Sequence, residues 1–306
     1  MADRAVLPPW SLAVTAMLSV QLGTALSAEL VSSVGPAGTA WLRLSFGALI
    51  SLLIARPPIR MIRRRDVLPL LALGVTIGVI TMSFLAAIDR IPLGTAVAIE
   101  FLGPLTVAAL RSHSVRALAW PLLALTGVVL LTEPWHGDIN VAGVGFASIS
   151  ALGLAVYILL TQRIGDRFTG IGALSVTIPV AAVTAAIVGI PQASGAITPE
   201  VLLAAAGLAL LLPVLPFALE LLALRRMTPA AFGTLMAVEP AIGLLLGLLV
   251  LQQEPSAYQL AGIVLVVIAG AAAQRHRRHR RRATGPAGAH GGPRYREMSI
   301  ASSPTS

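Results

Sequence analysis

The sequence predicts an all-α membrane protein whose ten transmembrane helices form two inverted five-helix repeats. The 306 residues are 56% hydrophobic and only 11% charged, whereas a soluble domain averages about 25% charged residues. The mean hydropathy is +0.86. Apolar runs long enough to cross a bilayer alternate with short polar connections, and arginines gather in every second connection.

The predicted spans are apolar runs bounded by arginine, proline or glycine. A spanning helix needs roughly 17–25 such residues. The first run has no small-residue cleavage site after it, so it is interpreted as a retained helix and not as a signal peptide. The spans are 10–32, 36–55, 67–88, 92–110, 116–132, 142–163, 171–190, 200–223, 229–250 and 256–273.

The arginines predict the orientation, because an excess of them marks the cytoplasmic side. With the N-terminus inside, twenty arginines fall in inner segments, Arg90 falls in an outer loop, and Arg43 lies within a span. Both termini are therefore predicted to be cytoplasmic. Arginine replaces lysine throughout, and alanine, glycine and leucine are abundant, a composition that suggests a bacterial genome. The basic tail, 274–306, is predicted to be disordered and to bind anionic lipid headgroups, not nucleic acid.

Matching motifs indicate an internal repeat. "FLAAIDRIP" (84–92) aligns with "ELLALRRMTP" (220–229), and "LLALTGVVLL" (122–131) aligns with "YQLAGIVLVV" (258–267). Because five is odd, the second copy must enter the membrane from the opposite side. The predicted parts are a cytoplasmic N-terminus (1–9), a first repeat (10–135), a second, inverted repeat (140–273) and the tail (274–306).

Arg43 and Glu100 are opposite charges inside predicted spans. Counted from the outer ends of their spans, both lie about 10–12 Å deep. A charge at a helix centre costs about 2.5–3.5 kcal/mol on insertion scales, so the two are predicted to pair or to face one cavity. Either they form a structural ion pair, or Arg43 holds a substrate carboxylate when Glu100 does not occupy it.

Two further carboxylates are candidates for coupling. Glu239 lies near the middle of the predicted span 229–250, with no basic residue at similar depth in the second half. It is predicted to carry a coupled proton or to bind a substrate ammonium; the alternative is a neutral acid hydrogen-bonded to a neighbouring helix. Glu29 lies near the outer end of its span, where it either reaches the interface or belongs to a gate.

Prolines inside apolar runs predict broken helices, because each removes a backbone donor and frees a carbonyl. Freed carbonyls are tolerated in a membrane where they meet protein or a water-filled cavity. The spans 92–110, 200–223 and 229–250, joined by the first span, are therefore predicted to line a cavity; the alternative is kinks that only improve packing. The candidate lining residues are Pro104, Pro213, Pro216, Phe217, Met236 and Pro240.

Three segments carry a family resemblance: "AIDRIPLGTAVAIEFLGPL" (87–105), "LELLALRRMTPAAFGTLMAVEPAIG" (219–243) and "QQEPSAYQLAGIVLVVIAG" (252–270). They resemble the drug/metabolite transporter superfamily in its EamA-type branch, and within it the threonine/homoserine exporter group. The resemblance implies export of small amino acids across the bacterial cytoplasmic membrane by proton exchange and alternating access. The implied partners are a small zwitterionic substrate and protons.

Other function classes fit the sequence less well. An exporter of another metabolite or of a cationic drug is the nearest alternative; a channel or an intramembrane enzyme is less favoured. No predicted span contains histidine, the chain has no cysteine, and neither a metal-ligand spacing nor a Walker A motif occurs. No metal or other cofactor is therefore expected. The GxxxG patterns at 74–78 and 243–247 favour close helix contacts and leave the oligomeric state open.

Overall fold

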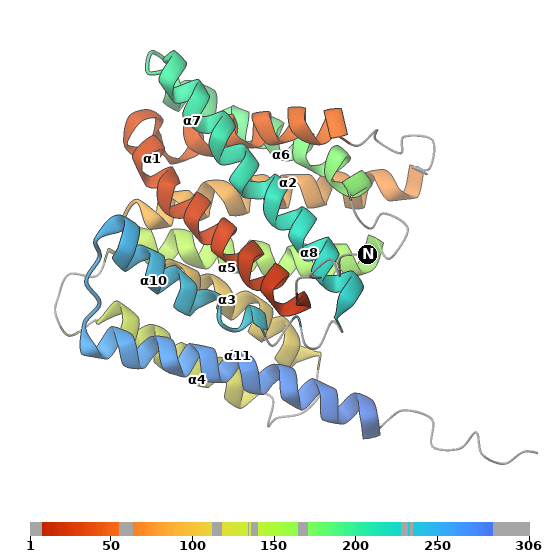
Figure 1. Ribbon diagram of the computed structural model, residues 1–306, viewed down its shortest axis with the longest axis vertical. Helices are drawn as coiled ribbons and strands as arrows, with labels where there is room; N and C mark the ends of the chain where they lie inside the picture. Colours follow the sequence, from red (N-terminus) through yellow and green to blue (C-terminus); the bar gives the residue numbers. More distant parts are fainter. Residues whose placement is uncertain are drawn as a thin grey trace, which may run out of the picture.

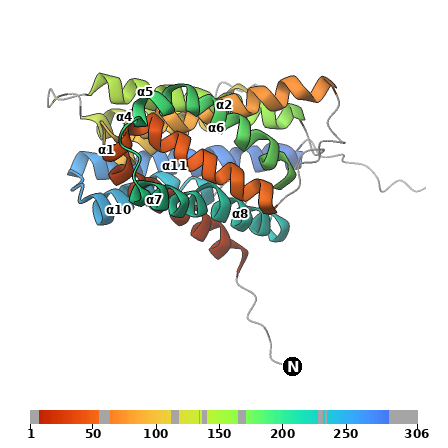
Figure 2. The same cartoon turned by 90° about the horizontal axis from the view of Figure 1, so that it is seen from above.

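The computed structural model describes residues 8–54, 64–111, 118–133, 135, 140–164, 171–227, 232 and 235–283, and the elements in these ranges are helices. Figure 1 shows the long helices running side by side, and Figure 2 shows the same bundle from above. The all-helical prediction is confirmed. Five of the described helices are long and apolar enough to cross a membrane: Trp10–Ile54, Arg64–Ile88, Leu93–Leu110, Val141–Arg163 and Ser175–Ala193.

The helices lie on the predicted apolar runs. The π-helical turn η5 (Leu210–Val214) joins two of them. In chain order the helices are α1 (Pro9–Ile54), α2 (Arg64–Ile88), α3 (Leu93–Leu110), α4 (Ala119–Thr132), α5 (Val141–Ile164), α6 (Ile171–Ala193), α7 (Pro199–Ala209), α8 (Leu215–Arg226), α10 (Glu239–Leu251) and α11 (Ala257–Ala283). The prediction that the tail is disordered from residue 274 is wrong, because α11 continues as a helix to Ala283.

Helix α1 covers two predicted spans and turns at Gly35. This residue has φ 75° and ψ 166°, a backbone conformation that is essentially restricted to glycine. The break leaves backbone N–H groups at the start of the second half without helical partners. Gln192 of α6 satisfies two of them, because its Oε1 accepts from Ala37 N at 2.7 Å and from Gly38 N at 3.1 Å.

The segment α7–η5–α8 is broken, as the two prolines of the predicted span 200–223 suggested. Leu212 has φ −155° and ψ 115°, outside the helical region. Both halves of α1 pack closely on this break: a Cβ on Gly23 would lie 3.2 Å from Leu211 Cβ, and one on Gly47 would lie 3.1 Å from Pro213 Cδ. Small residues on α1 therefore hold the irregular turn against the centre of the bundle.

Of the breaks predicted at Pro104 and Pro240, the first is wrong. Pro104 does not interrupt a helix, since α3 continues through it to Leu110. The break predicted in the span 229–250 is present, because a turn at 237–238 directly precedes α10. Pro240 occupies the first turn of α10, where backbone N–H groups have no partner within the helix, so a residue without an N–H costs no hydrogen bond. Glu239 lies in the same turn, at the positive end of the helix dipole.

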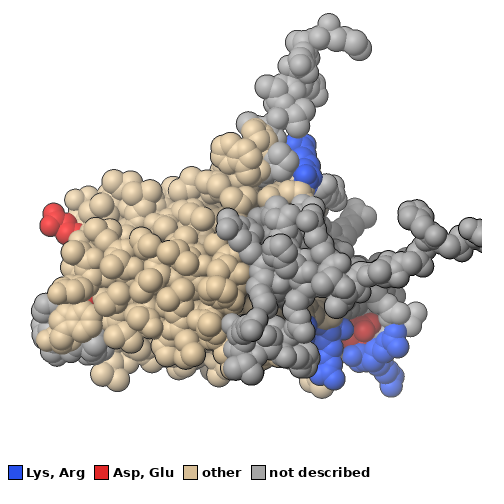
Figure 3. Space-filling model, turned by 90° about the horizontal axis from the view of Figure 1, so that it is seen from below, with Lys and Arg blue, Asp and Glu red and all other residues tan. Residues whose placement is uncertain are grey.

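On the face drawn in Figure 3, the charged residues at the surface lie toward the ends of the bundle. Figure 3 shows a broad uncharged surface between two charged ends, with the arginines of this face gathered at one end. Helices α4 and α11 lie together at one edge of Figure 1. The first GxxxG pattern forms a close contact with α6: a Cβ on Gly74 would lie 2.8 Å from Thr177 O, and one on Gly78 would lie 2.9 Å from Ala181 O.

Candidate functional site

A cavity of about 250 Å³ lies beside Arg43. Its walls come from α1, α2, α5 and α6 together with the broken segment η5–α8, so elements from both halves of the sequence form it. The lining is mainly aliphatic, with one arginine and two hydroxyl-bearing side chains. The lining residues are Val20, Arg43, Leu44, Ile77, Thr81, Tyr157, Ile178, Leu212, Pro213 and Pro216.

Arg43 is a buried cation, 4% exposed, whose hydrogen-bond partner is neutral. Its Nη1 donates to Ser27 Oγ at 2.8 Å, and Ser27 Oγ donates to Gly23 O at 2.6 Å. The serine proton is thus used within α1, which leaves the serine oxygen to accept from the guanidinium. A buried cation without a carboxylate partner is costly unless another group compensates its charge.

The predicted Arg43–Glu100 pair is wrong: the ion pairs in the described residues are Arg65–Asp66 and Arg90–Asp89. The half-buried Glu100 on α3 instead accepts from the Ser150 hydroxyl of α5. Helix α3 packs mainly on α5, α10 and α4, whereas α1 packs mainly on α6, α8 and α7. Equal depth along two helix axes did not determine which way each side chain points.

Glu239 has a neutral partner on α1, in agreement with the alternative of a carboxyl group that is hydrogen-bonded to a neighbouring helix. Gln21 Nε2 donates to Glu239 Oε1 at 3.3 Å. Gln21 is only 2% exposed, and within the described residues its Oε1 is buried without a hydrogen-bond partner. A buried orphan acceptor is rare in native structures. The Gln21–Glu239 hydrogen bond therefore joins the two halves, and Gln21 Oε1 can still accept a hydrogen bond from a donor.

The remaining predicted lining residues lie elsewhere or outside the description. Pro213 and Pro216 line the Arg43 cavity, whereas Glu100, Pro104, Met236, Glu239 and Pro240 are not among the described residues that line it. Pro240 is fully buried and Met236 packs against the core. The Phe217 side chain lies outside the described part of the chain. Contrary to the prediction, no described residue of α3 or α10 is among those that line this cavity.

Hydrogen bonds link the two halves at the end of the bundle that carries the α2–α3 and α10–α11 connections. Gln253 Oε1 accepts from Leu93 N at 3.0 Å, where α3 begins. The Ser256 hydroxyl donates to the Glu133 carboxylate. Each bond joins a residue of the first half to one of the second, so together they link the halves at this end of the bundle.

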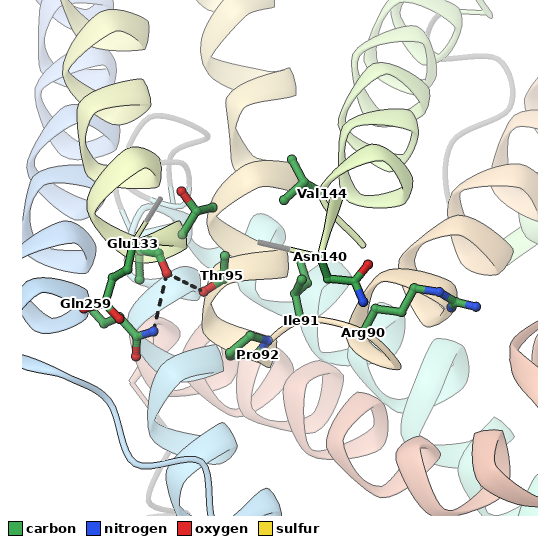
Figure 4. Close-up of a pocket in the computed structure, with 10 residues that line it drawn as sticks. Arg90, Ile91, Pro92, Thr95, Glu133, Asn140, Val144 and Gln259 are labelled. Atoms are coloured by element: carbon green, nitrogen blue, oxygen red, sulfur yellow. Dashed lines mark hydrogen bonds between the residues drawn. The ribbon is translucent and has the colours of Figure 1, made fainter. Parts of the chain in front are cut away.

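A cavity of about 210 Å³ lies at the same end. Figure 4 shows Thr95 and Gln259 directed toward one backbone oxygen near Glu133. This oxygen is Leu131 O, which accepts from Thr95 Oγ1 and from Gln259 Nε2, each at 3.4 Å. Gln259 thereby adds a further bond between the halves.

Glu29 lies apart from both cavities, on an exposed groove of about 470 Å³ between α1 and α7. Ser33 and Glu200 line the same groove. The exposed side chain of Glu29 agrees with its predicted place near an interface.

Several polar residues of these sites were not predicted. Gln21 and Ser27 both lie in "SVQLGTALSAEL" (19–30), and Thr81 and Tyr157 lie inside other apolar runs. Each is a neutral polar side chain inside a helix long enough to cross a membrane, and this was the feature of the sequence that could have identified it as part of a site. Charge drew attention to Arg43 and Glu239, while their neutral partners resembled ordinary residues of a membrane helix.

The comparisons with known proteins agree with this architecture. Residues 141–272 match the EamA-like transporter family. The chain is 33% identical over 258 residues to threonine/homoserine exporter RhtA of Salmonella typhimurium strain LT2, covering 83% of this chain and 87% of the relative. It is also 33% identical over 265 residues to RhtA of Escherichia coli strain K12, covering 85% and 89%.

The fold also occurs in a crystal structure that aligns with 86% of this chain and 97% of its own, with a TM-score of 0.56 and 20% identity. At that identity the likeness concerns the fold alone. The RhtA relatives are exporters and not enzymes, and their alignments span both halves of this chain. The chain therefore belongs to the EamA-like transporter family of the drug/metabolite transporter superfamily, as a multi-pass membrane transporter.

Proposed function

We propose that the chain is a secondary exporter of small, threonine- or homoserine-like amino acids, which it moves across the bacterial cytoplasmic membrane by proton exchange and alternating access. The observation that carries the proposal is the Arg43 cavity, where a buried guanidinium with a neutral partner lies beside a broken helix. The exporter relatives support the substrate class, since their names specify threonine and homoserine.

Arg43 is the proposed binding site for the substrate carboxylate. A guanidinium presents five N–H donors in a planar fork that matches a carboxylate. The bond to Ser27 Oγ uses Nη1 and holds the side chain at the cavity wall. A bound carboxylate would compensate the buried charge, which a neutral serine oxygen cannot do.

Glu239 is the proposed proton carrier. Its carboxyl lies at the start of α10 and contacts Gln21 of α1. If Glu239 takes up a proton, its new O–H can donate to an amide oxygen, and Gln21 Oε1 is an acceptor in need of a donor. A change in protonation would then alter a contact between the halves. Glu100 and Glu29 are secondary candidates for coupling.

The proposed architecture has ten spans in two inverted repeats, 10–135 and 140–273, with both termini in the cytoplasm. In this arrangement the end that carries the Gln253–Leu93 and Ser256–Glu133 bonds is the outer end. Those bonds join the halves there, so we expect outward release of substrate to require that they break. We assign 274–306, with its helical start, to a cytoplasmic segment that binds anionic lipid headgroups through its arginines.

An export assay tests this function. Cells that produce the full chain are loaded with labelled threonine or homoserine, and efflux is followed with and without a pH gradient across the membrane. We expect saturable efflux that the gradient accelerates. Cells with Arg43→Gln should show efflux near background at unchanged protein abundance, whereas Arg64→Gln, an exposed arginine at the start of α2, should resemble the parent. Efflux unaffected by Arg43→Gln would contradict the assignment.

A further inference from the structure

Within its described lining, the Arg43 cavity offers a charged partner for a carboxylate and none for an ammonium. Among the described residues that line it, Arg43 is the charged one, and Thr81 and Tyr157 provide the side-chain hydroxyls. Two carboxylates of the predicted spans, Glu100 and Glu239, have partners elsewhere. Glu100 accepts from Ser150, and Glu239 contacts Gln21; neither lines the cavity.

This distribution of charge favours one class of substrate. A monocarboxylate beside Arg43 makes a neutral complex. A zwitterionic amino acid there leaves one net positive charge, with its ammonium against aliphatic walls. Burying an uncompensated charge is more costly than burying a paired one. The described lining of this cavity therefore recognises the carboxylate of a substrate and provides no charged group for its ammonium.

We infer that the transporter also carries short hydroxy monocarboxylates, which have the carboxylate and hydroxyl of a small hydroxy amino acid but no ammonium. This inference rests on the carboxylate site at Arg43 that the proposed function assigns. The volume of about 250 Å³ suits a small molecule, because pockets for drug-sized ligands span about 300–1,000 Å³.

Thr81 provides a position for the substrate hydroxyl. Its Oγ1 donates to Ile77 O at 2.9 Å within α2, so its proton is already used. The threonine oxygen keeps its capacity to accept a hydrogen bond. A substrate hydroxyl can donate to it while the carboxylate binds Arg43 across the cavity.

The test uses three molecules that differ by one group each: threonine, 3-hydroxybutyrate, which is threonine without its ammonium, and threoninol, which is threonine without its carboxylate. The full chain is reconstituted in liposomes, and counterflow of labelled threonine and of labelled 3-hydroxybutyrate is measured separately. We expect 3-hydroxybutyrate to show counterflow and to compete with threonine at least as well as unlabelled threonine does. Threoninol should compete at least about tenfold more weakly.

Variants assign the effect to the cavity. Arg43→Gln should abolish counterflow of 3-hydroxybutyrate, and Arg64→Gln should leave it unchanged. Thr81→Val should raise the concentration of 3-hydroxybutyrate for half-maximal counterflow by about fivefold, as expected for one lost hydrogen bond. Thr81→Ser keeps the hydroxyl and should stay near the parent.

The outcomes separate this inference from the proposed function. Counterflow of threonine without counterflow of 3-hydroxybutyrate overturns the inference and leaves amino-acid export standing. Counterflow of 3-hydroxybutyrate alone supports the inference and overturns the amino-acid assignment. If threoninol competes better than 3-hydroxybutyrate, the ammonium is the recognised group and the inference is wrong.

Discussion

Ser27 shows how one neutral residue can determine the geometry of a charged site. It is fully buried, donates to Gly23 O and accepts from Arg43 Nη1. Ser27→Ala removes that acceptor, so the guanidinium loses its fixed orientation. We expect the KM for export to rise about fivefold, which corresponds to ~1 kcal/mol for one hydrogen bond, with a smaller change in kcat.

The matched control is Ser33→Ala, six residues further along α1. Its hydroxyl is exposed and donates to Glu29 O of the same helix at 3.2 Å. Kinetics of the two variants in the same liposomes separate positioning of Arg43 from a general effect on α1. Equal KM values for Ser27→Ala and Ser33→Ala would show that Ser27 does not position the binding group.

Glu239 supplies the second residue-scale prediction. Glu239→Gln keeps a polar group next to Gln21 but cannot take up or release a proton. We expect export driven by a pH gradient to fall to background, while exchange of internal for external substrate without a gradient persists. The control is Glu200→Gln, which changes an exposed carboxylate at the start of α7. Gradient-driven export that survives in Glu239→Gln would exclude this proton carrier.

At the scale of the element, sequence predicted where helices lie better than where they break. Apolar runs determine helix positions because backbone groups in lipid must bond within the helix. Proline predicted the positions of helix breaks less well than apolar runs predicted the positions of helices. It lies within a continuous α3 at Pro104, follows the extended Leu212 at Pro213, and occupies the first turn of α10 at Pro240. The outcome depends on neighbouring packing, such as Gly23 and Gly47 against η5, which the local sequence does not contain.

The Gly35 break allows a direct comparison of strain and crowding. Gly35→Ala forces a side chain into a backbone region that costs roughly 1–3 kcal/mol, and the new Cβ would lie 2.3 Å from Gln192 Cδ. Gly195 also has positive φ, 84°, but a Cβ there would meet nothing within 4 Å. We therefore expect Gly35→Ala to lower the Tm in detergent clearly more than Gly195→Ala. Equal decreases in Tm for the two variants would show that crowding against Gln192 adds no destabilisation beyond the backbone strain.

At the scale of the whole molecule, the order and apolarity of the helices were predictable, whereas the contacts between the halves were not. Gln253 and Ser256 resembled ordinary loop residues in "QQEPSAYQ" (252–259). In the structure Gln253 bonds to the start of α3, and Ser256 bonds to Glu133 after α4. Their partners lie more than a hundred residues away in sequence, so only the folded arrangement identifies them as links across the bundle.

These links predict that transport stops when the halves are joined covalently. The natural chain has no cysteine, so the double substitution Glu133→Cys and Ser256→Cys introduces the only thiols, at two side chains that contact each other. A short bifunctional thiol reagent should cross-link them and reduce export at least about tenfold, because alternating access requires the halves to separate at this end.

A reagent with a cleavable linker should restore export when the linker is reduced. Each single-cysteine variant treated with the same reagent is the control. Full export by the cross-linked protein would mean that the pair lies outside the moving interface.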